Sequence, residues 1–155
     1  MNPLLPDQDG REAAFEEATR DVFSETFPPM NETHKTSLNE LSKLAYQNAV
    51  DKGFHDDDYE KSTVELYAKW TANIHGEVSE LWEAARNGDL KIFCDKYSYF
   101  KQLGLDYLTC EQEELADIII RVLDTAGARS IDIGQAVLLK MAYNATRPHM
   151  HGKLA

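Results

Sequence analysis

The stretch IHGEVSELWEAA, residues 74–85, decides the fold together with a second stretch, EELADIIIRVLD, residues 113–124. Each carries two acidic residues three positions apart, Glu77 with Glu80 and Glu114 with Asp117. In an α-helix, residues at this spacing lie on the same face. Each pair borders apolar residues at the spacing of an amphipathic helix. These are Val64, Tyr67, Thr71, Ile74, Val78, Leu81 and Ala85 in the first helix, and Leu115, Ile118, Ile119, Val122 and Ala126 in the second. If the two apolar stripes pack together, the four carboxylates converge.

Four acidic side chains at the edge of a core predict a bound cation, because burying unpaired charge is costly. Carboxylate oxygens suit a hard divalent cation, Mg²⁺ or Mn²⁺, whereas zinc and copper usually recruit histidine or cysteine. The alternative is a solvated helix face, since the pattern Glu-x-x-Glu is common on helices. Two such pairs, each beside an apolar stripe, make the metal site as good an interpretation as the solvated face, and both stay open at this point.

The overall charge narrows the range of partners. The 155 residues carry a formal net charge of -11, which argues against a nucleic acid polymer as a ligand. From Arg121 onward, however, five lysines and arginines stand against two acidic residues. An acidic body with a mildly basic C-terminal part suits a metal ion and a phosphate group.

Cysteine usage and hydropathy indicate a cytoplasmic protein. Cys94 and Cys110 lie outside any Cys-x-x-Cys spacing, so we expect structural thiols, and no secretory signal is recognised at the N-terminus. No apolar run approaches the roughly 20 residues that cross a bilayer. We therefore expect no membrane association.

The order of periodic segments predicts an all-α fold, an antiparallel helical bundle with an extra N-terminal helix. We expect a flexible lead over 1–10, a helical extension over 11–30 and a helical domain over 31–155. Helices are expected at 37–52, 62–86, 111–127 and 132–146, with the acidic turn at 56–58 capping the second of them. In the first of these helices the residues expected to face inward are Leu38, Leu41, Leu44, Ala45 and Ala49.

Residues 89–110 follow no long period and are rich in aromatic side chains. Such side chains stack on a nucleotide base or pack against the bundle or a partner subunit, and packing is the favoured interpretation. The aromatic residues are Phe93, Tyr97, Tyr99, Phe100 and Tyr107.

The C-terminal stretch KMAYNATRPHMHGK, residues 140–153, groups hydrogen-bond donors. Lys140, Asn144 and Arg147 recur at spacings of four and three, which places them on one helical face. Donors of this kind suit phosphate oxygens. The alternative is a basic helix end that complements the helix dipole. Opposite four acidic residues, the phosphate interpretation is the stronger one.

Three stretches together resemble the successive motifs of the MazG-like nucleotide pyrophosphohydrolases, in the all-α NTP pyrophosphatase superfamily. They are GEVSELWEA, EELADIIIRVLD and KMAYNATRPHMHGK, and the likeness covers about residues 37–153. The resemblance implies a helical bundle that assembles as a homodimer or homotetramer. It also implies magnesium-dependent hydrolysis of a nucleoside triphosphate to the monophosphate and pyrophosphate, with Mn²⁺ as a substitute metal.

The resemblance assigns the acidic pairs as catalytic metal ligands. Many members have a further glutamate directly before the first motif, where this chain has Gly76, so the general base stays open. The other assignments concern substrate. The phosphate-binding candidates are Lys140, Asn144, Arg147 and Lys153, with Arg121 and His151 as weaker ones.

Two of these assignments have a structural alternative. An ion pair with Asp117, four residues earlier, explains Arg121 equally well. Trp70 and Trp82 are weak candidates for stacking on a base, and a place in the core is the commoner role for a tryptophan.

Two other classes of protein compete with this interpretation. A di-iron carboxylate bundle requires Glu-x-x-His pairs, and none of the five histidines has a glutamate three residues before it. The second is a non-catalytic helical oligomer that binds a nucleotide or a protein and keeps the acidic residues around a structural metal. The sequence leaves open the base, the sugar, the number of metal ions, the phosphorus attacked and the choice between dimer and tetramer.

Overall fold

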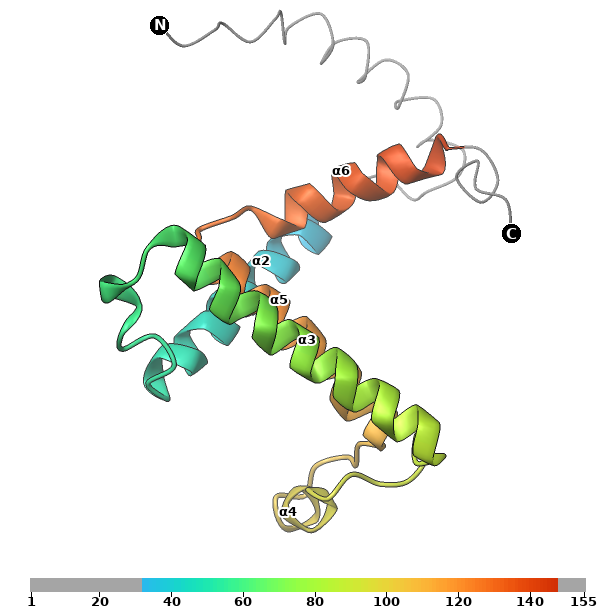
Figure 1. The fold of residues 1–155 in the computed structure, drawn as a ribbon. Helices are drawn as coiled ribbons and strands as arrows, with labels where there is room; N and C mark the ends of the chain where they lie inside the picture. Colours follow the sequence, from blue (N-terminus) through green and yellow to red (C-terminus); the bar gives the residue numbers. More distant parts are fainter. Residues whose placement is uncertain (1–31, 148–155) are drawn as a thin grey trace, which may run out of the picture. The chain divides into compact units, whose positions relative to one another are not determined.

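The computed structural model describes residues 32–147, and within this range the chain is all-helical (Figure 1). The helices are α2 (Glu32–Asp51), the 3₁₀ helix η1 (Asp58–Glu60), α3 (Thr63–Asn87), α4 (Tyr97–Gln102), α5 (Cys110–Ala128) and α6 (Ile133–Ala145). No β-strand occurs between residues 32 and 147, where one isolated bridge joins Phe93 and Thr109. The all-α expectation is therefore confirmed. The lead over 1–10 and the helical extension over 11–30 lie outside the described residues.

Residues 40–131 form one compact unit, whose centre is the pair α3 and α5. Figure 1 shows these two helices side by side. Residues near the start of α3 contact the end of α5, and residues further along α3 contact earlier residues of α5. The Arg129 guanidinium lies over the Tyr67 ring, with 5.9 Å to its centroid, and Nε of Arg121 lies 2.8 Å from Oε1 of Glu77. The two helices that carry the acidic motifs are thus antiparallel, as expected.

Small residues bring the second half of α2 close to α5 in the same unit. Ser42 is buried, and its hydroxyl donates to the carbonyl of Leu123 at 2.8 Å. A Cβ added to Gly127 would lie 2.6 Å from Cβ of Tyr46 and 2.8 Å from the carbonyl oxygen of Ser42. Such distances exclude a side chain at position 127 unless the helices move apart.

Capping boxes begin both helices that carry the acidic motifs. Ser62 caps α3 together with Glu65, and Thr109 caps α5 together with Gln112. At the other end of α3, Gly88 adopts a left-handed conformation with φ of 82°, the usual role of glycine after a helix. The expected boundaries of both helices are correct within one residue.

Two local expectations at helix starts are wrong. The acidic turn at 56–58 does not cap α3, because Ser62 does so, and Asp58 pairs instead with His55 of the same turn and with Lys69 of α3. Helix α2 begins at Glu32 rather than near residue 37. In both cases the chain offers more than one possible helix start. The sequence pattern did not show which of them the helix uses.

The second unit includes the described residues 32–39 and 132–147. Asp132 caps α6, as expected, since its carboxylate accepts from the backbone N–H of Gln135 at 2.9 Å. The same carboxylate oxygen accepts from the Asn39 amide, and this hydrogen bond is the main reason that the pKa of Asp132 lies below its usual value. Asn39 in turn accepts from the backbone N–H of Gly134 at 2.9 Å. These contacts hold the start of α6 to the α2 segment of this unit.

The aromatic side chains between α3 and α5 pack mainly on one another. Phe93 stacks on Tyr97 with ring centroids 5.2 Å apart, and Tyr107 lies 4.6 Å from Tyr97. Backbone hydrogen bonds from Cys94 to Leu108 and from Cys110 to Ile92 close the segment at its base. The favoured interpretation, packing against the bundle or a partner subunit, stays a prediction, because these rings contact one another and Phe93 and Tyr107 are 55% and 41% exposed. Helix α4 was not predicted.

Most of each predicted apolar stripe is exposed in the single chain, which corrects the expectation that the stripes pack together. On α3, Val64 and Val78 are exposed; on α5, Leu115, Ile119 and Val122 are exposed. Leu41 and Leu44 of α2, expected to face inward, are exposed as well. The buried residues of α3 are Trp70 and Glu77, so the interface with α5 includes an acidic residue. The apolar side chains that the single chain leaves uncovered lie on its surface.

The structure also shows the environment of the two cysteines and the apolar character of the described helices. Cys94 is buried and Cys110 half-buried, and both are free thiols. Burial raises the pKa of the Cys94 thiol. None of the helices within residues 32–147 combines the length and the apolar character needed to cross a bilayer.

Candidate metal centre

Three of the four predicted ligands come together between α3 and α5. One carboxylate oxygen from each of Glu77, Glu80 and Glu114 lies within 4.8 Å of the others. Glu80 is exposed, whereas Glu77 and Glu114 are largely covered. The helical spacing of the first motif places Glu77 and Glu80 on one face of α3, and the antiparallel packing brings Glu114 to them from α5.

Of the three clustered carboxylates, that of Glu114 is the one whose burial is least offset by polar contacts. Its Oε2 atom is buried and has no hydrogen-bond partner. Burial, followed by the negative charges of Glu80 and Glu113, raises the pKa of Glu114 above its usual value. A buried carboxylate oxygen without a partner is unfavourable, so a cation bound beside it would stabilise the site.

Asp117, the fourth predicted ligand, lies beside the cluster rather than in the group of three. Burial raises its pKa, and the charges of Glu77 and Glu113 raise it further. Its carboxyl is therefore close enough to the other carboxylates for their negative charges to affect its pKa. The first three acidic residues form the core of the candidate site, and Asp117 lies at its border.

Arg121 partly neutralises the cluster from α5. Its Nε donates to Oε1 of Glu77 at 2.8 Å, across the interface between the two helices. The ion pair with Asp117 inside α5, an alternative from the sequence, is therefore replaced by a pair with the other helix. Sequence spacing identifies intrahelical neighbours only, because it does not give the register between two helices.

Sequence reasoning missed a second ion pair at the cluster, between Lys96 and Glu113. Glu113 is buried and pairs with the Lys96 ammonium, which also lies 3.1 Å from Asp95. The hydrogen bond with Glu113, followed by that with Asp95, raises the pKa of Lys96. The two adjacent acidic residues at 113 and 114 were the available signal, but the cation lies in the segment without periodicity.

Two of the predicted phosphate-binding residues, Lys140 and Arg147, lie near the ring of Tyr143 in the second unit. The Lys140 ammonium lies 4.7 Å from the centroid of Tyr143, and the Arg147 guanidinium lies 5.9 Å from it. Asn144 is half-buried, and Arg147 follows the end of α6. The two cations thus share an aromatic neighbour. Lys153 and His151 lie outside the described residues.

The two tryptophans differ in their surroundings. Trp70 is 5% exposed and packs edge-on against Tyr67, with 5.4 Å between ring centroids, so it has the core position that the sequence offered as an alternative. Trp82 is 65% exposed. A stacking partner for a base requires an accessible ring face, which Trp82 has and Trp70 lacks in this chain.

The donor set fits a magnesium ion. It consists of carboxylate oxygens, which Mg²⁺ and Mn²⁺ prefer, and includes neither a thiolate nor an imidazole. The uncompensated oxygen of Glu114 and the raised pKa values of Glu114 and Asp117 describe a site with an excess of negative charge. A donor set of this kind is chemically suited to a divalent cation.

Comparisons of this chain with models of protein families, with curated proteins and with solved structures find no match. The likeness to MazG-like enzymes therefore rests on the three motifs and their order.

Proposed function

We propose that this protein is a magnesium-dependent nucleoside triphosphate pyrophosphohydrolase. It would cleave an NTP or dNTP between the α and β phosphates, to the monophosphate and pyrophosphate, as housekeeping of the cytoplasmic nucleotide pool. The observation that carries the proposal is the cluster of Glu77, Glu80 and Glu114 with its unpartnered buried oxygen. The three MazG-like motifs supply the reaction class.

In this proposal the side chains have separate roles. Glu77, Glu80, Glu114 and Asp117 hold magnesium, which would neutralise phosphate charge and lower the pKa of a bound water. Lys140 and Arg147 bind and stabilise the leaving pyrophosphate, and Asn144 orients it by a hydrogen bond. Lys153, with His151 as a weaker candidate, adds to these phosphate contacts.

We also infer that the active form is a homodimer or homotetramer. Val78 and Trp82 of α3 are 44% and 65% exposed, and Leu115 and Ile119 of α5 are 45% and 55% exposed. Exposed large apolar side chains at successive helical turns favour association, because burying apolar surface stabilises by about 25 cal/mol per Å². A second copy of the chain is the partner that the family resemblance implies.

The alternative function is a non-catalytic helical oligomer that binds a nucleotide or a protein around a structural metal. Gly76 favours it, since the glutamate of many MazG-like enzymes is missing there. A Cβ at position 76 would meet no atom within 4 Å, so lack of space does not explain the glycine.

Pyrophosphate release from a panel of common NTPs and dNTPs, with magnesium and with EDTA, tests the proposal. The variant Glu80→Gln removes one ligand charge with little change of shape. Glu83→Gln is the matched control, because Glu83 lies one turn further along α3 with a 64% exposed side chain. We expect metal-dependent turnover in the wild type and in Glu83→Gln, and a loss of at least about a hundredfold in Glu80→Gln, in line with the weight of metal charge stabilisation in this chemistry.

Two results would contradict the proposal. Turnover that EDTA does not abolish would exclude the metal mechanism. A folded protein that binds magnesium but releases no pyrophosphate from any nucleotide would favour the non-catalytic alternative.

A further inference from the structure

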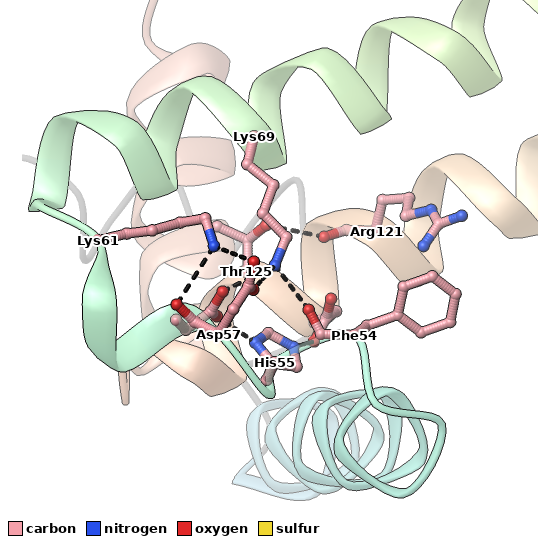
Figure 2. A network of polar contacts seen from close by, with 9 residues as sticks. Phe54, His55, Asp57, Lys61, Lys69, Arg121 and Thr125 are labelled. Atoms are coloured by element: carbon pink, nitrogen blue, oxygen red, sulfur yellow. Dashed lines mark hydrogen bonds and ion pairs between the residues drawn. The ribbon is translucent and has the colours of Figure 1, made fainter.

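The turn between α2 and α3, residues 53–61, is held by a network of polar contacts that the proposed chemistry does not use (Figure 2). His55 is largely buried. One ring nitrogen lies 2.6 Å from Oδ2 of Asp58 and the other 2.9 Å from Oδ1 of Asp124 in α5. The Tyr46 ring of α2 packs edge-on against His55 with 4.9 Å between centroids. The turn is thereby tied to α2 and α5.

Lys69 of α3 holds the same turn from the other side. Its ammonium donates to Asp58 at 2.7 Å and to the carbonyl oxygen of Phe54 at 2.6 Å. Burial opposes ionisation of Asp58, but the hydrogen bonds from Lys69 and His55 outweigh it and lower the pKa of that carboxyl. Phe54 is therefore fixed both through its own carbonyl and through the next residue.

The fixed residue Phe54 presents its ring to Arg121. The guanidinium carbon lies 5.6 Å from the ring centroid, within the range of a cation–π contact. Figure 2 shows the Arg121 side chain extending beside this ring. The Nε atom of Arg121 also donates a hydrogen bond to Glu77 of the carboxylate cluster. Two contacts in different directions thus define the orientation of one guanidinium.

The terminal nitrogens of this guanidinium make no hydrogen bond within residues 32–147. They carry four N–H donors in a planar fork, the geometry that matches two oxygens of a phosphate. The side chain is 31% exposed, so solvent reaches it. Because Nε is bound to a cluster carboxylate, these free donors lie at the edge of the candidate metal centre.

We propose that Arg121 binds a phosphate group of the substrate at the metal centre, and that the turn 53–61 positions it through Phe54. This inference rests on the proposed function. It raises Arg121 from a weak candidate to a substrate-binding residue and makes Phe54 a positioning residue. His55 and Lys69 act through Phe54.

The test measures two ligands, Mn²⁺ alone by electron paramagnetic resonance and inorganic pyrophosphate at saturating Mn²⁺ by calorimetry. Arg121→Gln removes the fork. Phe54→Leu keeps an apolar side chain but removes the ring, and it disturbs the turn less than a substitution of buried His55. Tyr59→Leu is the matched control, an aromatic residue of the same turn that is 84% exposed.

We expect Arg121→Gln to weaken pyrophosphate binding roughly tenfold or more, the effect of losing a charge-assisted contact. Phe54→Leu is expected to weaken it several-fold while Mn²⁺ binding stays within about twofold of wild type, since the carboxylates are unchanged. In the Arg121→Gln background, Phe54→Leu should have no further effect. Tyr59→Leu should behave as wild type.

Pyrophosphate affinity that is unchanged in Arg121→Gln would overturn the assignment, as would a wild type that binds Mn²⁺ but no pyrophosphate. Additive losses in the double variant would refute the positioning role of Phe54. A wild type that does not bind Mn²⁺ would instead contradict the proposed function on which the inference rests.

Discussion

At the scale of single residues, Glu80 gives the clearest test of metal binding. It is the exposed member of the cluster, so Glu80→Gln should weaken the site without disturbing the core. Magnesium at about a hundred times its dissociation constant should raise the wild-type free energy of unfolding by about 2.7 kcal/mol. Urea denaturation with and without Mg²⁺ should show a clearly smaller gain in Glu80→Gln. An equal gain in both proteins would place the metal elsewhere.

The raised pKa of Glu114 predicts that the free energy of unfolding depends on pH when EDTA keeps the protein free of metal. Its pKa is raised on folding, so the folded state holds the proton more tightly than the unfolded state. Ionisation therefore destabilises the protein as pH rises from near 4.5, the ordinary value, through the raised value. Glutamine mimics the neutral acid. We expect the free energy of unfolding of Glu114→Gln, relative to wild type, to increase between pH 5 and pH 8.

Urea denaturation at the two pH values measures this difference. The same comparison for Glu83→Gln, at an exposed position of α3, should change little. A relative stability of Glu114→Gln that falls with rising pH would show that folding does not raise the pKa of Glu114.

At the scale of helices, two helical glycines, Gly76 in the middle of α3 and Gly127 near the end of α5, lead to opposite predictions for the same substitution. Gly127 lies where α5 meets Ser42 and Tyr46 of α2, and its Cβ would overlap their atoms. We expect Gly127→Ala to cost about 1–3 kcal/mol by overpacking. Gly76 of α3 has open space, so Gly76→Ala should stabilise by about 0.5–1 kcal/mol through helix propensity. Thermal denaturation followed by circular dichroism measures both. Equal effects would mean that α2 and α5 are not in close contact at Gly127.

At the scale of the whole molecule, the exposed apolar side chains of α3 and α5 predict self-association. Ile119 is 55% exposed on α5. We expect Ile119→Glu to shift the protein to monomers, because an ionised side chain is costly to bury in an interface. Sedimentation equilibrium of wild type and variant measures the mass. Tyr59→Glu, on the turn before α3, should leave the mass unchanged, and a monomeric wild type would contradict the homo-oligomer.

The sequence by itself determined helices α3, α5 and α6 and pointed to the acidic residues of the candidate site. Periodicity predicted α3, α5 and α6 closely because amphipathic spacing and end signals such as Asp132 and Gly88 act over a few residues. The spacing of Glu77 and Glu80 likewise determined that both lie on one helix face. These features depend on local geometry, which the order of residues contains.

Only the tertiary structure decided which side chains meet across helices. The pairs Arg121 with Glu77, Lys96 with Glu113 and His55 with Asp124 join residues far apart in the chain. It also left Leu115 and Ile119 exposed, although their spacing predicted burial. The physical reason is that periodicity identifies an apolar face but not what covers it, because the register and rotation of one helix against another depend on the packing of all the side chains between them.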